Sequence, residues 1–223
     1  MIYKKKVILR RIFSLLLLWI MAAFSVNPVA AENSVDITSS FSERIIGGTV
    51  APAEFTQWVA AILWHDEPDP FFGQFCGGSL IASEWVLTAA HCVEGTIPGD
   101  VDVLLGQAAL SGSGGLRIQA DQIIIHPDYT AAQSGDDIAL IHLSSSVPIE
   151  QMKLPGQIFD LPLATGGTNA VVFGWGKTDP FFPDFPDELM MVGVPIVSNA
   201  LCSVSYPGLI NPSQLCAGLL QGG

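Results

Sequence analysis

The sequence predicts an all-β protein, built as a sandwich or a barrel. From Ile45 onward, short β-branched or apolar runs recur, and clusters of glycine, proline, aspartate and serine separate them. Amphipathic helical periodicity is nearly absent over the same stretch. With 223 residues, of which 49% are hydrophobic, the chain has enough apolar side chains for a packed core. This composition argues against a disordered protein.

Seven runs are expected to form strands, because each is short, β-branched or apolar, and bounded by turn residues. They are residues 58–64, 79–88, 101–105, 117–125, 138–143, 170–173 and 190–197. One short helix is expected over residues 198–205, where Ser198 or Asn199 offers an N-cap. The elements therefore follow the pattern of many short strands with turn-rich connections.

Two long loops and one connector interrupt these strands. The loops, residues 66–74 and 179–187, each contain prolines, acidic residues and two adjacent phenylalanines. They are interpreted either as loop tips folded back on the surface or as apolar rims beside a binding cleft. Residues 147–163 contain three prolines and are expected to connect two halves of the protein.

Residues 1–31 have the composition of a signal peptide. A basic region with three lysines and two arginines precedes an apolar run over residues 12–24, and Val29-Ala30-Ala31 offers small residues for cleavage. The apolar run is shorter than the roughly 20 residues that a membrane span needs. We therefore expect a secreted or periplasmic protein without a stable membrane anchor. The polar residues 32–44 are interpreted as a linker or propeptide.

The charge of the chain changes once the leader is removed. Residues 32–223 carry four basic and 21 acidic residues, a formal net charge of −17. Nucleic acids and anionic membrane surfaces should repel such a chain, so neither is an expected partner. The acidity by itself does not indicate a substrate.

Four cysteines remain in the exported part, namely Cys76, Cys92, Cys202 and Cys216. An even number of cysteines in an oxidising compartment predicts two disulfides, with three pairings open. Zinc is not expected, because the sequence has no Cys-x-x-Cys and no His-x-x-x-His spacing.

Three stretches carry residues suited to chemistry. The first is Arg44-Ile45-Ile46-Gly47-Gly48, a protease-cuttable arginine before a small and apolar new terminus. The second combines Phe75-Cys76-Gly77-Gly78-Ser79 with Thr88-Ala89-Ala90-His91-Cys92, and the third is Asp136-Asp137-Ile138-Ala139-Leu140. An imidazole can accept and return a proton near neutral pH, and a carboxylate can fix its tautomer.

In this order, the three stretches resemble the chymotrypsin/trypsin-like serine endopeptidases. The resemblance extends from Ile45 to Gly223 and includes Phe173-Gly174-Trp175-Gly176 and Cys216-Ala217-Gly218. It implies two antiparallel six-stranded β-barrels, the first over about residues 45–146 and the second, incomplete here, over about residues 155–223. It also implies the disulfides Cys76–Cys92 and Cys202–Cys216.

The resemblance implies a role for each matching residue. His91 would be the general base and then acid, held at the end of a strand, and Asp137 would orient it, with Asp136 a solvated neighbour. Cleavage between Arg44 and Ile45 by an activating protease would convert a zymogen into an enzyme that hydrolyses peptide bonds in proteins. The remaining histidines, His65, His126 and His142, are expected to be loop or surface groups. A monomer without cofactor or metal is expected.

The nucleophile does not fall within the sequence as given. The family pattern continues beyond Gly223 with a Gly-Asp-Ser-Gly-Gly-type segment, and its specificity pocket also lies there. The 223 residues are therefore expected to be inactive alone, as an incomplete reading of an active zymogen. A non-catalytic protein-binding module and a truncated product that never folds stably are the alternatives.

Ser113, within Ser111-Gly112-Ser113-Gly114-Gly115, is expected to lie in a turn. The absence of carboxylates over residues 107–116 argues against a calcium site in this loop.

Overall fold

The computed structural model describes residues 48–154, 166–178 and 185–218. All of them belong to the second of two units into which the chain divides, Phe41–Gly223. The expected signal peptide, the propeptide and the Arg44–Ile45 junction lie outside the described residues. So do residues 155–163 of the connector and residues 179–184 of the second long loop.

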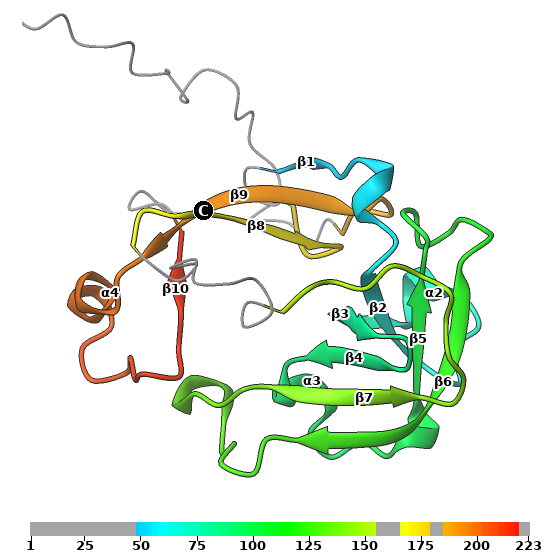
Figure 1. The fold of residues 1–223 in the computed structure, drawn as a ribbon, viewed down its shortest axis with the longest axis horizontal. Helices are drawn as coiled ribbons and strands as arrows, with labels where there is room; N and C mark the ends of the chain where they lie inside the picture. Colours follow the sequence, from blue (N-terminus) through cyan, green and yellow to red (C-terminus); the bar gives the residue numbers. More distant parts are fainter. Residues whose placement is uncertain (1–47, 155–165, 179–184, 219–223) are drawn as a thin grey trace, which may run out of the picture. The chain divides into compact units, whose positions relative to one another are not determined.

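Six strands close into an antiparallel barrel with the order β2-β3-β4-β7-β6-β5 (Figure 1). They are β2 (Val59–Trp64), β3 (Gln74–Ala82), β4 (Trp85–Thr88), β5 (Val101–Leu105), β6 (Leu116–Ile125) and β7 (Ala139–Leu143). In β7, buried residues alternate with partly exposed ones, as expected for a strand with one face on a core. All five residues of β5 are buried. The barrel core is aliphatic, and its fully buried side chains include Ile62, Leu80 and Ile141.

Short helical turns connect these strands. They are η2 (Ala53–Phe55), α2 (Pro70–Gly73), α3 (Ala90–Val93), η3 (Pro98–Asp100) and η4 (Ala132–Ser134). The first long loop contains α2, where Asp69 caps the turn by accepting from the Phe71 N–H at 2.9 Å and Pro70 occupies the first helical position. Phe71 packs against buried residues, whereas Phe72 is 73% exposed. The two adjacent phenylalanines thus divide between core and surface.

A second antiparallel sheet is partly formed around β9 (Met190–Val197). Its other strands are β1 (Thr49–Val50), β8 (Asn169–Gly174) and β10 (Cys216–Ala217), and each pairs with β9. The helix α4 (Asn199–Ser205) follows β9, and the Ser198 hydroxyl accepts from the Leu201 N–H at 3.3 Å as the expected N-cap. The all-β prediction is confirmed.

A buried cluster joins the barrel to the second sheet. Trp175, only 2% exposed, packs with Leu63 and Leu104 of the barrel and with Leu189 beside β9. Its indole N–H donates to the Ala108 carbonyl at 2.9 Å. The two sheets therefore share a core.

One expected strand is wrong in its extent. Residues 79–88 form parts of two strands, because the chain turns back at Ser83 and Glu84 between β3 and β4. This turn contains no glycine or proline, so the run lacks the usual sequence signal of a reversal. The two-residue strands β1 and β10 were not expected either.

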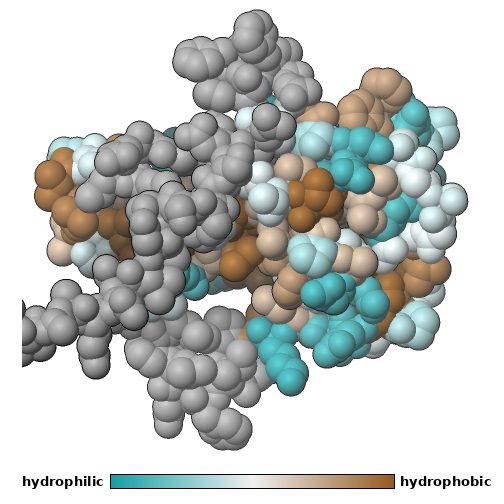
Figure 2. Space-filling view, turned by 90° about the horizontal axis from the view of Figure 1, so that it is seen from above, coloured by the Kyte–Doolittle hydropathy of each residue, from teal (hydrophilic) through white to brown (hydrophobic). Residues whose placement is uncertain are grey.

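The surface of α4 is apolar on one face. Leu201 and Val204, three residues apart and so on the same side of the helix, are 49% and 74% exposed. Apolar surface also gathers at the left of Figure 2, the side on which Figure 1 places α4.

Among the described residues, the helices are all too short to cross a membrane.

Candidate active site

The β3–β4 hairpin places the segment that contains His91. Leu80 of β3 pairs with Val86 of β4, and the backbones approach closely at Gly78, where an added Cβ would lie 2.8 Å from the Leu87 carbonyl oxygen. The buried Thr88 hydroxyl donates to the Gly77 carbonyl at 2.8 Å. Close packing between these two strands therefore requires a residue without a side chain at Gly78 of the second motif.

The pairing of β4 with β7 brings the second and third motifs together. Thr88, the last residue of β4, pairs with Ala139, the first residue of β7. Because the strands are antiparallel, the residues that follow Thr88 lie next to those that precede Ala139. His91 and Asp137 are therefore placed side by side by sheet register, although they are 46 residues apart in sequence.

His91 lies in the one-turn helix α3 and not at the end of a strand as expected, because the chain turns after Thr88. Its side chain is 51% exposed, and that of Asp137 is 20% exposed. The Nδ1 atom of His91 lies 2.7 Å from Asp137 Oδ2, and the backbone N–H of His91 donates to Asp137 Oδ1 at 2.8 Å. Asp137 thus uses both of its carboxylate oxygens to hold His91.

Asp137 is ionised more readily than an ordinary aspartate. Burial raises the pKa of its carboxyl, but hydrogen bonds from the His91 ring and from the backbone of His91 and Ala90 outweigh this effect, and the net pKa is lowered. An ionised carboxylate can only accept hydrogen bonds. The proton between the two side chains is therefore on His91 Nδ1, and Nε2 is left to exchange protons.

The backbone before Asp137 is held in an uncommon conformation. Gly135 has φ +85° and Asp136 has φ +54°, both in the left-handed region. The Asp136 N–H donates to the Ser213 hydroxyl at 3.1 Å, and the Asn211 side-chain amide donates to the Ser134 carbonyl at 2.6 Å. A turn at residues 211–214 therefore holds the loop that carries Asp137.

This contact between residues 211–214 and residues 133–136 was not predicted from the sequence. Asn-Pro-Ser at 211–213 is a recognisable turn signal, but a single sequence does not show what the turn touches. A cavity of about 520 Å³ lies at the same place, lined by Thr88, Asp137 and Ser213 among others. Asp137 thus has His91 on one side and an open space on another.

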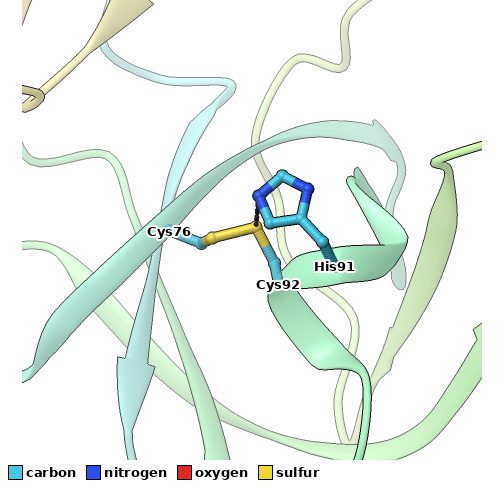
Figure 3. A group of neighbouring side chains, drawn as sticks. All are labelled: Cys76, His91 and Cys92. Carbon is cyan, nitrogen blue, oxygen red and sulfur yellow. Dashed lines mark hydrogen bonds between the residues drawn. A yellow bond between two sulfur atoms is a disulfide. The ribbon is translucent and has the colours of Figure 1, made fainter. Parts of the chain in front are cut away.

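Both disulfides are present in the pairing that the resemblance implied. Cys76 is bonded to Cys92, and Cys202 to Cys216. Cys76, His91 and Cys92 place three potential metal-ligand atoms within 4.8 Å of one another (Figure 3). The two sulfurs are bonded to each other, however, and a metal binds thiolates. The group as it stands is therefore not a metal site.

The other histidines are not all free surface groups. His65 Nδ1 lies 2.9 Å from Asp102 Oδ1, and this buried aspartate also accepts from Arg117 Nε at 2.6 Å. His142 lies within β7 with its side chain partly exposed, and its Nδ1 is 2.5 Å from Asp121 Oδ1. His126 lies in a turn, where its Nδ1 accepts from the Asp128 N–H at 3.3 Å. Neither His65 nor His142 contacts the His91 pair.

Comparison with known proteins agrees with the resemblance to trypsin-like serine proteases that the sequence motifs indicated. The trypsin family model matches residues 45–223. A trypsin of Xenopus laevis is 39% identical over 155 residues, which are 67% of this chain and 60% of that protein. Human serine protease 1 is 40% identical over 151 residues, 67% of this chain and 59% of that protein. The chain therefore spans about three-fifths of the length of these relatives.

A solved structure supports the fold. The Vibrio cholerae VesB protease matches with a TM-score of 0.66 and 33% identity, over 79% of this chain and 53% of that one. A closed antiparallel barrel with a second antiparallel sheet packed on it is the trypsin-like architecture. The chain belongs to the trypsin family of serine proteases.

Proposed function

We propose that the chain is part of a secreted trypsin-like serine endopeptidase, made as a zymogen, in which His91 and Asp137 are catalytic. The observation that carries this proposal is the 2.7 Å contact between His91 Nδ1 and Asp137 Oδ2 on a half-exposed ring. Family membership supports the reaction type, hydrolysis of peptide bonds in protein substrates.

In the proposed mechanism, His91 Nε2 takes the proton of a serine hydroxyl as that oxygen attacks the substrate carbonyl. The proton then passes from Nε2 to the leaving amine, and a water molecule repeats the sequence to release the acyl group. Asp137 keeps the proton on Nδ1 and stabilises the positive imidazolium. These roles are those of the family's general mechanism, placed on the two residues that this chain brings together.

Export and activation belong to the same proposal. The basic and apolar composition of residues 1–31 supports a signal peptide, and Arg44-Ile45 supports cleavage by a protease that cuts after arginine. The propeptide would then be residues 32–44. The new terminus at Ile45 would complete the active conformation, as the family resemblance implies.

The serine is not among the described neighbours of His91. The ring nitrogens of His91 contact Asp137 and Cys92, and within the described ranges none of the serines is hydrogen-bonded to the ring. Residues 45–223 alone are therefore predicted to hydrolyse no peptide above a buffer blank. Turnover that an active-site serine reagent abolishes would contradict this prediction.

The proposal is tested on the product of the complete coding sequence. Reading the DNA past codon 223 is expected to reveal a Gly-Asp-Ser-Gly-Gly segment, and a stop codon there would favour a binding module or a truncated product that never folds stably. The protein is then treated with a protease that cuts after arginine, and peptide hydrolysis is measured. Arg44→Gln should prevent activation, and Asp137→Asn should lower kcat by about 10⁴-fold, a magnitude already known in this family.

His91→Ala should abolish hydrolysis above the serine-free background. The matched control is His126→Ala, which removes a histidine that does not contact Asp137. Equal activity of the His91→Ala protein and the control would refute the proposed roles.

A further inference from the structure

The disulfide Cys76–Cys92 has an ionisable group next to one of its two sulfurs. His91 Nε2 lies 3.5 Å from Cys92 Sγ, as Figure 3 shows. The contact is asymmetric, because the imidazole reaches Cys92 and the recorded hydrogen bonds of the ring do not include Cys76. The two sulfurs therefore differ in their chemistry.

Asp137 holds the imidazole in the orientation that points Nε2 toward Cys92. Asp137 holds Nδ1 at 2.7 Å, so Nε2 is the atom that faces the disulfide. The ring is half-exposed and both cysteines are partly exposed, so small solutes can approach. The geometry thus places a ring nitrogen that can exchange protons beside a disulfide between two partly exposed cysteines.

Thiol–disulfide exchange depends on the sulfur that leaves. The attacking thiolate bonds to one sulfur, and the other departs as a thiolate, faster when its negative charge is stabilised. A protonated imidazole beside a thiolate stabilises it, as in enzymes with paired cysteine and histidine. Cys92 is therefore the favoured leaving sulfur and Cys76 the attacked one.

Acidic side chains lie near the His91 ring. Asp137 contacts it, and Asp136 precedes Asp137 in the chain. Tyr129 donates to Glu94 at 3.2 Å, and desolvation, followed by the charge and hydrogen bond of Glu94 and the charge of Asp137, raises the pKa of its hydroxyl. Glu94 follows α3, and Asp136 and Asp137 lie on the loop before β7. A carboxylate beside an imidazole ring stabilises a positive charge on that ring.

The second disulfide lacks such a neighbour. Within the described residues, the recorded contacts of Cys202 and Cys216 include no histidine, lysine or arginine side chain. Cys202 is also buried, at 8% exposure. Cys202–Cys216 therefore serves as an internal reference in the same molecule.

We propose that Cys76–Cys92 is a site of thiol–disulfide exchange with a small thiol, in which His91 acts as general acid toward Cys92. The thiolate attacks Cys76 Sγ and forms a mixed disulfide there. The bond between the two cysteines breaks, and Cys92 Sγ takes its electron pair together with the proton of His91 Nε2. A second thiol can displace Cys76 and leave both cysteines reduced, with the thiol co-reactant oxidised to its disulfide.

The experiment uses the chain without denaturant and reduced glutathione as the thiol. Samples are quenched with acid, free thiols are alkylated with N-ethylmaleimide, and peptides are identified by mass spectrometry. Glutathione is expected on Cys76 and the alkyl group on Cys92. Glutathione mainly on Cys92 would overturn the proposal.

The role of His91 is tested by the pH dependence of the rate. Imidazolium is replaced by neutral imidazole as the pH rises from 5 to 8. His91→Gln should slow exchange about tenfold at pH 6, and the difference should shrink by pH 8.5, when rates are compared at equal thiolate concentration. The control His126→Gln should behave like the parent. Equal rates of His91→Gln and parent at both pH values would overturn the proposal.

A folding defect would be visible in the reference disulfide. If His91→Gln accelerates exchange at Cys202–Cys216, the comparison is made with Asp137→Asn, which keeps the imidazole but weakens its imidazolium. Because this variant is itself expected to be less stable, its rate at Cys76–Cys92 is divided by its rate at Cys202–Cys216 in the same sample. This ratio should fall at pH 6 by a smaller factor than in His91→Gln, and an unchanged or higher ratio would refute the proposal. Masses are read directly, so the result does not depend on peptidase activity.

Discussion

At the residue scale, the ionised form of Asp137 contributes to stability through its hydrogen bonds. Its pKa in the folded protein is below the ordinary value of 3.8, which represents the unfolded chain. The folded state therefore binds fewer protons near this pH, and the contribution is fully present above pH 3.8. It is lost as the pH falls through the lower folded value.

Asp137→Asn should accordingly lower the free energy of unfolding at pH 6 and make less difference as the pH falls below 3.8. Urea denaturation at a series of pH values measures this. Asp128→Asn is the control, since this exposed aspartate has no recorded side-chain partner among the described residues. A stability difference for Asp137→Asn that is constant from pH 6 to pH 3 would contradict the assignment.

The sequence indicated His91 and Asp137 because both lie in motifs whose neighbours are distinctive. It did not indicate that residues 211–214 hold the loop before Asp137, or that His91 contacts Cys92. Those contacts depend on which turn touches which loop and on a side-chain rotamer, and neither is encoded in local spacing. The same limit applies to His65, whose partner Asp102 is 37 residues away in the chain.

At the element scale, the loop before β7 depends on a glycine in close contact. A Cβ at Gly135 would lie 2.5 Å from Asn211 Nδ2 and from Ser213 Oγ, and φ there is +85°. Gly167 has a similar φ of +91° but nothing within 4 Å. A substitution at Gly167 therefore tests backbone strain alone, whereas one at Gly135 tests backbone strain together with steric contact.

Gly167→Ala should destabilise the protein by about 1–2 kcal/mol, the usual cost of a left-handed alanine. Gly135→Ala should lower the free energy of unfolding by at least about 1 kcal/mol more than Gly167→Ala does, because it also disturbs the hydrogen bonds of Asn211. Thermal or urea denaturation of both variants measures the difference. Equal losses would mean that the contact between residues 211–214 and this loop is not stabilising.

The strands that were predicted well are largely apolar runs with polar or turn-forming residues within two positions of each end. Residues 101–105 and 190–197 form β5 and β9 with the expected bounds. The pairing order of the barrel was not predicted, because periodicity shows which face of a strand is buried but not which strand lies next to it.

At the scale of the whole molecule, the core around Trp175 joins the barrel to the second sheet. Leu104 and Leu110 meet Leu189 around its indole. Because this core is shared, we expect a single cooperative unfolding transition for the two sheets. Coincident curves from circular dichroism and tryptophan fluorescence would support this, and two separate transitions would contradict it.

Trp175→Phe should lower the free energy of unfolding by about 1–3 kcal/mol, because a buried indole loses volume and its hydrogen bond to Ala108. The control is Trp64→Phe, since Trp64 is 43% exposed and should cost less than 1 kcal/mol, about the effect of a surface substitution. Urea denaturation compares the two. An equal or larger loss for Trp64→Phe would show that the shared core is not a main source of stability.

The closed barrel has a consequence for the order in which the chain can fold during synthesis. All its strand pairings are made within residues 59–143, so His91 and Asp137 can meet before β9 leaves the ribosome. A closed barrel also leaves no free strand edge to recruit another nascent chain. By contrast β1, made first, must wait for β9, and so the earliest strand is among the last to find its partner.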